Sequence, residues 1–405
     1  MNAETHNAAF SRANPCSSAF ITLRKTLFNF LDVPFDLHRK TILAGRPPLN
    51  EILTGRRPVV LFPAARMATV AAALLQARGV DVRGFSDKNP SRHGQTINGL
   101  PVVSPTQITT LSPSASVLVA SSLHDSAICE FLGKSGCTSI FPMPYLSYCL
   151  PDVFPCREYS QAIEAPYLPG AREQITQLFE LLADDASRQV LVNKIRYYLS
   201  LDKKLLDDIK CSQAIYFDAE IHAPSPDESV VDGGAFNGDT LQQFLGIVGG
   251  HFRQYYAFEP DAGVFVQIRK VAAADPARIE CVCAGLSDRT GTMFFSATGA
   301  VDSAFVAASS QSSKRMPVVD LDTYFSDRRP PTLIKMDIEG GERAALEGSR
   351  RLIGEHRPTL AVSAYHFPKD IWEIPLLLAQ LSPGARIYLR HYKREIDDTV
   401  CYAIP

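Results

Sequence analysis

The sequence lacks the long apolar runs and the charge imbalance that are typical of membrane and nucleic-acid-binding proteins. No run of 18 apolar residues occurs in the 405 residues, so no segment is expected to span a bilayer as a helix. The formal net charge is −2, which gives no basic field for nucleic acid or a membrane surface. Residues 1–18 are polar and lack the apolar core of a secretory signal, so we expect a cytoplasmic protein.

Cysteine is present without a recognisable pattern. The nine cysteines are an odd number and form no C-x-x-C pair, which argues against a disulfide framework. We therefore expect reduced thiols, buried in packing, as in a cytosolic protein. Cys281 and Cys283 alternate along a predicted strand and should point to one face of it.

Strand and helix patterns alternate through two separate stretches of the chain. A length of 405 residues predicts two or three domains, and the composition is that of a globular protein. We predict an N-terminal arm at 1–56, a small Rossmann-like domain at 57–165, a helical linker or cap at 166–211 and a second α/β domain at 212–405. The linker itself is placed in the proline-containing stretch at 151–168.

The small domain lacks the glycine turn of a dinucleotide site. Its first strand, 58–62, is followed by Pro63-Ala64-Ala65, whose side chains would crowd a pyrophosphate. Asp87 ends the second strand, where an acid could bind a ribose, but a lone loop aspartate is more often solvated or capping. We therefore favour a substrate-recognition or assembly domain over a nucleotide-binding one.

The second domain opens with a strand, a glycine-rich turn and a helix. The apolar run at 229–231 ends in Asp232, and Gly233, Gly234 and Gly238 follow before a helix with apolar residues at helical spacing. Glycines let the backbone approach a ligand, and the helix start offers unpaired N–H groups. The spacing is G-G-x-x-x-G rather than the dinucleotide fingerprint, so the turn alone is weak evidence.

An acidic residue at the end of the next strand strengthens this interpretation. The run 255–258 ends in Glu259, a little over 20 residues after the turn, where a carboxylate can accept both hydrogen bonds of a ribose diol. Further strands are predicted at 279–284, 332–337, 359–364, 386–389 and 399–403, with antiparallel additions at 292–295, 305–306 and 316–319. One helix is predicted from Gly341 to Ile353.

Four segments of this domain resemble the FkbM-type methyltransferases, a family of the class I enzymes that depend on S-adenosylmethionine. They are Val-Asp-Gly-Gly-Ala-Phe-Asn-Gly-Asp-Thr at 231–240, Phe-Glu-Pro at 258–260, Ile-Lys-Met-Asp-Ile-Glu-Gly-Gly-Glu at 334–342 and Leu-Arg-His-Tyr at 389–392. Gly341 stands where the family pattern usually has alanine. The resemblance covers residues 212–405 and implies a Rossmann-like seven-stranded sheet whose last strand is antiparallel.

The resemblance also implies roles for individual residues. The cofactor S-adenosylmethionine would be held by Asp232, Gly233, Gly234, Asn237, Gly238, Glu259, Asp288 and Asp337. Among these, Glu259 would hold the ribose hydroxyls, Asp288 would contact the adenine ring, and Asp337 would lie beside the transferred methyl group.

Methyl transfer to an oxygen needs alignment of the reacting atoms and a base for the hydroxyl proton. Strand alternation puts Lys335 and Asp337 on one face, either as a structural ion pair or as catalytic groups. Glu339 lies just beyond, and His366 ends the neighbouring strand as a base or an orienting group. Asp337, Glu339 and His366 could also hold Mg²⁺, although no ligand spacing specifies it. We expect His391 and Tyr392 to line the pocket.

The sequence thus predicts an O-methyltransferase acting on a sugar, a polysaccharide or another small natural product. We expect the protein to bind a small-molecule or carbohydrate acceptor and not to bind nucleic acid or a membrane. The sequence leaves open whether it forms a homodimer. The alternative is a non-catalytic module of the same fold that binds a nucleotide-sugar or a protein. A nicotinamide-dependent oxidoreductase using residues 57–150 is disfavoured by the turn at Pro63.

Overall fold

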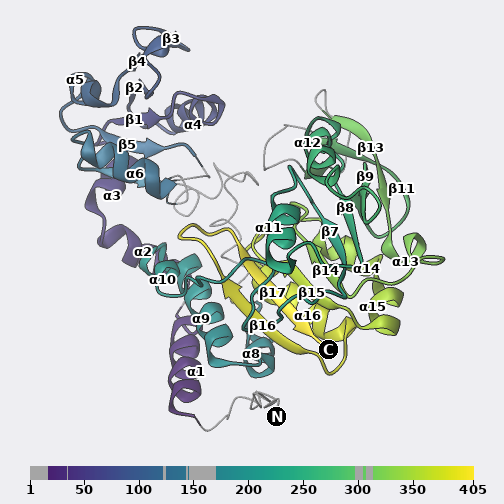
Figure 1. Cartoon of the computed structure of the whole chain (residues 1–405). Helices are drawn as coiled ribbons and strands as arrows, with labels where there is room; N and C mark the ends of the chain where they lie inside the picture. The colour runs from purple at the N-terminus through teal and green to yellow at the C-terminus, as the bar shows by residue number, and fades with distance from the viewer. Residues whose placement is uncertain are drawn as a thin grey trace, which may run out of the picture. The chain divides into compact units, whose positions relative to one another are not determined.

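The computed structural model describes residues 17–33, 35–121, 125–142, 145, 170–296, 304–306 and 313–405. Its contacts divide the chain into two compact units (Figure 1). Unit 1 comprises Met1–Thr26, Glu173–Val192 and Ile209–Pro405, and unit 2 comprises Leu27–Arg172 and Asn193–Asp208. The helical stretch predicted as a linker is thus shared between the units, and the segment 151–168 lies outside the described residues. The four-part division of the chain stays a prediction.

Unit 2 is built on a six-stranded sheet of order β3-β4-β2-β1-β5-β6. Its strands are β1 Val59–Phe62, β2 Val82–Ser86, β3 Thr96–Ile97, β4 Leu100–Val103, β5 Ser116–Val119 and β6 Ile140–Pro142. All neighbours pair in parallel except β3 with β4. The crossover helices are α4 Arg66–Ala77, α5 Ile108–Leu111 and α6 Asp125–Lys134, with single 3₁₀ turns at Pro90–Arg92 and Pro105–Gln107. The predicted small α/β domain is therefore present.

Asp87 in unit 2 has a structural partner at the first turn of this sheet. Its carboxylate accepts hydrogen bonds from the backbone N–H of Ala64 at 3.1 Å and of Asn89 at 2.9 Å. The residue is buried, and Arg92 lies 3.5 Å away. Asp87 therefore serves as the cap of the turn that follows β1, which is the structural role that the sequence favoured over a ribose contact.

In the described residues, three helices precede the first sheet along the chain and three lie between the two sheets. They are α1 Ser18–Leu31, α2 Phe35–Ala44, α3 Pro47–Leu53, α8 Arg172–Leu181, α9 Asp185–Ser200 and α10 Lys204–Asp207. No helix in the described part of the chain is both long and apolar enough to cross a membrane.

Unit 1 contains a seven-stranded sheet of order β16-β17-β15-β14-β7-β8-β9. The strands are β7 Ser229–Gly233, β8 Gln254–Phe258, β9 Ile279–Val282, β14 Leu333–Met336, β15 Thr359–Ser363, β16 Arg386–His391 and β17 Thr399–Ile404. Strands β7, β8, β9, β14 and β15 pair in parallel, and β17 runs antiparallel to both β15 and β16. The predicted seven-stranded sheet with an antiparallel last strand is confirmed.

The strand order changes direction between β14 and β7. The chain steps outward from β7 through β8 to β9, then returns to β14 and steps the other way through β15 (Figure 1). Because parallel crossovers are right-handed, α11 Asp239–Val248 and α12 Ala262–Ala272 cover one face, and the helices after β14 and β15 cover the other. Ligands of such sheets bind at this switch point, beyond the carboxyl ends of the strands.

A four-stranded sheet of order β10-β13-β11-β12 lies outside the main sheet. Its strands are β10 Gly285–Leu286, β11 Gly291–Ser296, β12 Ala304–Val306 and β13 Ser313–Val319, followed by the short helix α13 Leu321–Tyr324. The predicted antiparallel pairing of β11 with β12 and β13 is confirmed. The predicted strand 279–284 is too long, because β9 ends at Val282 and Gly285 pairs with Val318 of β13.

The single helix predicted up to Ile353 is wrong, because the structure has two. Helix α14 Glu342–Glu347 ends at Gly348, and α15 Arg350–His356 begins at Ser349. A side chain at Gly348 would overlap the carbonyl oxygen of Ser287, so the backbones meet closely at this break. The carboxylate of Asp322 then accepts the N–H groups of Arg351 and Leu352 at 3.0 and 2.7 Å, which starts the second helix.

Aromatic rings fill the core of unit 1 beneath α11. Phe244 of α11 packs against Phe217, Phe252 and Tyr255, with ring centroids 5.6, 5.6 and 5.4 Å apart. Each such pair adds about 0.5–1.5 kcal/mol beyond the burial of its area. On the far side of the sheet, α16 Asp370–Leu381 buries eight residues of its length despite Pro375.

The edge strand β16 is covered by residues from earlier in the chain. The N–H of Ala183 donates to the carbonyl of Ile387 at 2.8 Å, and the N–H of Cys211 donates to that of His391 at 2.7 Å. Arg390 of β16 forms an ion pair with Asp184 at 2.7 Å. The segments before β7 therefore close one edge of the main sheet.

Candidate active site

The glycine turn after β7 is fixed by backbone hydrogen bonds to the next strand. The N–H groups of Gly234 and Ala235 both donate to the carbonyl of Phe258 at 3.0 Å. Gly238 has a φ of +88° and leads into α11, and Asn237 accepts the N–H of Asp239 at 3.0 Å. The turn lies at the carboxyl end of β7, as the sequence predicted. The hydrogen bond to Asn237 stabilises the conformation of the turn.

Gly234 lies against the end of strand β14. Its φ is +74°, and a Cβ there would overlap the carbonyl oxygen of Asp337. Glycine is required at this position because any side chain would both strain the backbone and push the turn away from β14. The turn and the end of β14 are therefore in van der Waals contact.

Replacing Gly234 with alanine should lower the free energy of unfolding by about 2–4 kcal/mol. The matched control is Gly246→Ala on the exposed part of α11, where an added Cβ meets nothing within 4 Å. That change should be neutral or stabilising by up to about 1 kcal/mol, because alanine is the better helix former. Chemical denaturation measures both; equal stability of the two variants would contradict the close contact.

Glu259 joins the end of β8 to the glycine turn. Its two carboxylate oxygens accept the N–H of Phe236 at 3.1 Å and that of Asp261 at 2.7 Å. Its side chain is buried, and burial raises the pKa of Glu259 against the opposing effect of these hydrogen bonds. The predicted ribose acid thus lies beside the turn, and its carboxylate is held in a fixed orientation.

Lys335 on β14 binds both Asp232 and the backbone of the glycine turn. Its Nζ lies 2.8 Å from Asp232 Oδ1, and it donates to the carbonyls of Gly233 and Gly234 at 3.1 and 2.8 Å. Burial opposes the charged ammonium, but Asp232 and Asp337 outweigh it and raise the pKa of Lys335. The predicted direct pair with Asp337 is wrong: the partner is Asp232, which lies opposite Lys335 in the register of β14 with β7. Lys335 holds the turn in place and stays protonated.

Asp337 follows β14, and its carboxylate accepts two hydrogen bonds and faces the ring of His366. Tyr216 donates to Oδ2 at 2.7 Å, Tyr365 donates to Oδ1 at 2.9 Å, and His366 Nε2 lies 3.4 Å from Oδ1. Burial alone would raise the pKa of Asp337, but the charges of His366 and Lys335 and the Tyr216 hydrogen bond lower it. The carboxylate is therefore ionised and strongly oriented.

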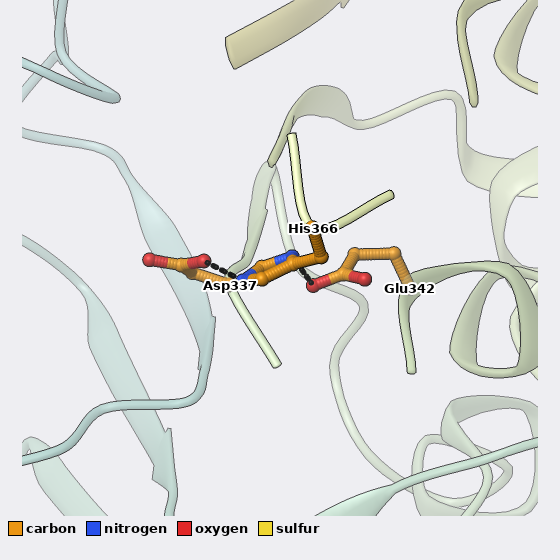
Figure 2. A group of neighbouring side chains, drawn as sticks. All are labelled: Asp337, Glu342 and His366. Carbon is orange, nitrogen blue, oxygen red and sulfur yellow. Dashed lines mark ion pairs between the residues drawn. The ribbon is translucent and has the colours of Figure 1, made fainter. Parts of the chain in front are cut away.

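His366 follows β15, and its ring lies between two carboxylates (Figure 2). Nδ1 is 3.1 Å from Glu342 Oε1, and Nε2 is 3.4 Å from both Asp337 Oδ1 and Glu339 Oε2. Burial would lower its pKa, but Glu342, Asp337 and Glu339 raise the pKa of His366 to about 10. Without a bound ligand the imidazole is protonated at neutral pH, so it orients the carboxylates and is not poised to accept a proton.

Glu342, at the start of α14, is an acid that sequence reasoning did not select. Its side chain is 2 % exposed, and it accepts the N–H of Ile338 at 2.8 Å. Burial and the nearby Glu342 raise the pKa of Asp370 to about 7. Glu342 lay within the Ile-Lys-Met-Asp-Ile-Glu-Gly-Gly-Glu segment, which offered a signal that could have identified it.

Tyr216 and Tyr365 are the other site residues that the sequence did not reveal. Tyr216 lies before β7 with a φ of +66°, and Lys335 Nζ is 5.2 Å from the centre of its ring. Tyr365 immediately precedes His366, and their rings lie 4.2 Å apart. No spacing rule connects Tyr216 to the strand ends, so its role depends on the fold.

Four other residues that the sequence singled out have contacts of their own. Asp288 is exposed and follows β10 in the four-stranded sheet, where it accepts from Ser287 Oγ at 3.2 Å. Cys283 directly follows β9, and burial followed by the charge of Glu259 raises its pKa. His391 is fully buried in β16 with Nδ1 2.9 Å from Thr399 Oγ1, and Tyr392 donates to Asp218 at 3.1 Å. His391 and Tyr392 therefore belong to the packing of the sheet edge.

The seven-stranded α/β fold of unit 1 is the one that the sequence resemblance implied. Residues 232–396 match the family model of the Methyltransferase FkbM domain. A crystal structure of methyltransferase FkbM from Methylobacillus flagellatus KT is similar to this chain, with 22 % identity, a TM-score of 0.69 and coverage of 95 % of this chain and 99 % of that one. Both findings are consistent with an FkbM methyltransferase domain in the C-terminal part of the chain.

Other solved structures are less similar. Fibrillarin from Aeropyrum pernix, in complex with natively bound S-adenosyl-L-methionine, has 13 % identity and a TM-score of 0.30, covering 45 % of this chain and 69 % of that one. A search of curated proteins found no match.

Proposed function

We propose that this protein is an S-adenosylmethionine-dependent O-methyltransferase that acts on a hydroxyl group of a sugar, a polysaccharide or another small natural product. One observation carries the proposal: the glycine turn, Glu259, Asp337 and His366 occupy neighbouring strand ends in the domain that the FkbM model covers. The methyltransferase activity is the activity of that family. The acceptor class rests on the sequence resemblance.

The cofactor would lie across the ends of β7, β8 and β14. Glu259 uses one lone pair of each oxygen for the N–H groups of Phe236 and Asp261, and a carboxylate has about four acceptor positions. Ribose hydroxyls can therefore still donate to it. The glycines let the turn pack closely against Leu286 and Asp337, and the acidic groups at Asp337 suit a positively charged sulfonium.

The reaction needs an aligned hydroxyl and a place for its proton. The acceptor oxygen forms a bond to the methyl carbon while the carbon–sulfur bond breaks, and the electron pair of that bond returns to sulfur. Asp337 is ionised and fixed by hydrogen bonds from Tyr216 and Tyr365, so it can accept a hydrogen bond from the hydroxyl and then its proton. His366, protonated beside it, holds the carboxylate in orientation.

S-adenosylhomocysteine, the product form of the cofactor, should raise the melting temperature of the full-length protein by several degrees. At a ligand concentration of 100 times Kd, binding adds about 2.7 kcal/mol to stability. Glu259→Gln should remove most of this rise, because an amide replaces one ribose-binding oxygen with a donor. A parent protein whose melting temperature does not change would contradict the cofactor proposal.

The control for this experiment is Glu355→Gln. Glu355 is 55 % exposed on α15, so the same acid-to-amide change there should leave the ligand-induced rise intact. A loss of the rise in both variants would mean that the effect at Glu259 is not local.

A further inference from the structure

The group at the ends of β14 and β15 holds more negative than positive charge. Three carboxylates, from Asp337, Glu339 and Glu342, surround the single imidazole of His366 at 3.1–3.4 Å. Side-chain oxygens of Asp337 and Glu342 and a nitrogen of His366 all lie within 4.8 Å of one another. Like charges that are packed this closely repel one another. A divalent cation would therefore stabilise the group more than the single proton on His366 does.

The surroundings of His366 also indicate a ligand-binding site. Its side chain is only 8 % exposed, yet neither Nδ1 nor Nε2 makes a hydrogen bond of acceptable geometry. Most buried polar groups are hydrogen-bonded, and an unsatisfied one costs about 1–3 kcal/mol. Nδ1 faces Glu342 and Nε2 faces Asp337 (Figure 2). Glu339 Oε2 also lies 3.4 Å from Nε2.

The distances at Nε2 fit the spacing of metal ligands. Bonds of about 2.1 Å at octahedral or tetrahedral angles place neighbouring ligand atoms about 3.0–3.4 Å apart. Nε2 lies 3.4 Å from Asp337 Oδ1 and 3.4 Å from Glu339 Oε2. The other nitrogen faces the buried Glu342 at 3.1 Å, and a metal-bound histidine commonly donates its second N–H to such a carboxylate.

We propose that Asp337, Glu339 and His366 Nε2 bind a divalent metal ion, with Glu342 as the partner of Nδ1–H. One imidazole among carboxylates suits Mn²⁺ better than Mg²⁺, which prefers oxygen ligands alone. Three protein ligands would leave coordination positions for an acceptor or for water. This inference rests on the proposed function only for the role of the ion, not for its binding.

In that role the ion defines the acceptor as one with two neighbouring hydroxyls. A vicinal diol would occupy two open positions, and coordination lowers the pKa of a bound hydroxyl. The hydroxyl proton would leave to solvent, because Asp337 would be bound to the ion. The oxygen would bond to the methyl carbon, and sulfur would keep the electron pair of the broken carbon–sulfur bond. Acceptors with a single hydroxyl would bind through one contact and react more slowly.

The test measures Mn²⁺ binding to the full-length protein after dialysis against EDTA, by electron paramagnetic resonance of free Mn²⁺. We expect one ion per chain. His366→Asn and Glu339→Gln should each weaken binding at least 10-fold, and Glu342→Gln should weaken it about 10–100-fold. The control Glu355→Gln should bind as the parent does. If His366→Asn does not fold, Glu339→Gln decides the result, since its side chain is 28 % exposed.

Two results would overturn the proposal: no Mn²⁺ bound by the parent protein at millimolar concentration, or equal binding by the parent and the Glu339→Gln variant. Binding of S-adenosylhomocysteine is measured separately, without metal. Cofactor binding without Mn²⁺ binding would refute the metal site and leave the proposed function intact. Mn²⁺ binding without cofactor binding would support the site and refute the proposed function.

Discussion

Replacing Lys335 with methionine is expected to lower the free energy of unfolding by about 3–5 kcal/mol. Lys335 Nζ and Asp232 Oδ1 lie 2.8 Å apart, with side-chain exposures of 2 % and 0 %. Methionine fills the space of the lysine chain but leaves the Asp232 carboxylate buried without its counter-charge. The carbonyl of Gly234 also loses the ammonium donor, whereas that of Gly233 keeps the N–H of Asp337 at 3.0 Å. Chemical denaturation of the full-length protein measures the loss.

Two further variants show whether the loss comes from the unpaired charge. Adding Asp232→Asn to Lys335→Met removes that charge and should recover part of the stability, since Tyr255 can still donate to an amide oxygen. Lys134→Met removes a lysine that is 75 % exposed and pairs with Glu130, and it should cost about 0.5 kcal/mol or less. If Lys335→Met were as stable as Lys134→Met, the buried pair would have no structural role.

Asp337→Asn is expected to lower turnover about 100-fold or more, while the affinity for S-adenosylhomocysteine changes little. A general base typically raises the rate about 10²–10⁴-fold. The lowered pKa of Asp337 makes it a weaker base, so we expect a rate loss toward the lower end of that range. An amide cannot accept the hydroxyl proton, and its NH₂ group faces one of the two tyrosine donors. Transfer of a tritiated methyl group to a panel of monosaccharides and nucleotide-sugars measures turnover.

The control for this prediction is Tyr365→Phe. It removes the 2.9 Å hydrogen bond to Asp337 Oδ1 but leaves the carboxylate and the Tyr216 donor in place. Turnover should therefore fall by less than with Asp337→Asn. Turnover of the Asp337→Asn variant within threefold of the parent would exclude Asp337 as the proton acceptor.

The sequence predicted the sheet well because each strand end carried its own signal. Val230 and Val231 lead directly into the glycine turn, and the run at 255–258 leads into Glu259, so local patterns placed both residues at one edge. Parallel pairing of β7 with β8 and β14 then brought Asp337 to the same edge without further information. Periodicity and strand order together were sufficient for this part of the site.

Contacts between distant segments could not be predicted in this way. The partner of Lys335 depends on the register between β14 and β7, which strand alternation along β14 alone does not contain. Tyr216 reaches Asp337 from an irregular segment with a positive φ, for which the sequence has no motif. The break at Gly348 depends on how closely Ser287 approaches from the four-stranded sheet.

The backbone hydrogen bonds that earlier segments make to the edge strand β16 limit how far this protein can be shortened. A fragment that begins at residue 232, where the family match begins, would lose the backbone partners that Ala183 and Cys211 provide to Ile387 and His391. Exposed strand edges recruit other chains, so such a fragment should aggregate in solution. A trimmed version suited to crystallisation would have to retain residues 173–192 as well as everything after 209.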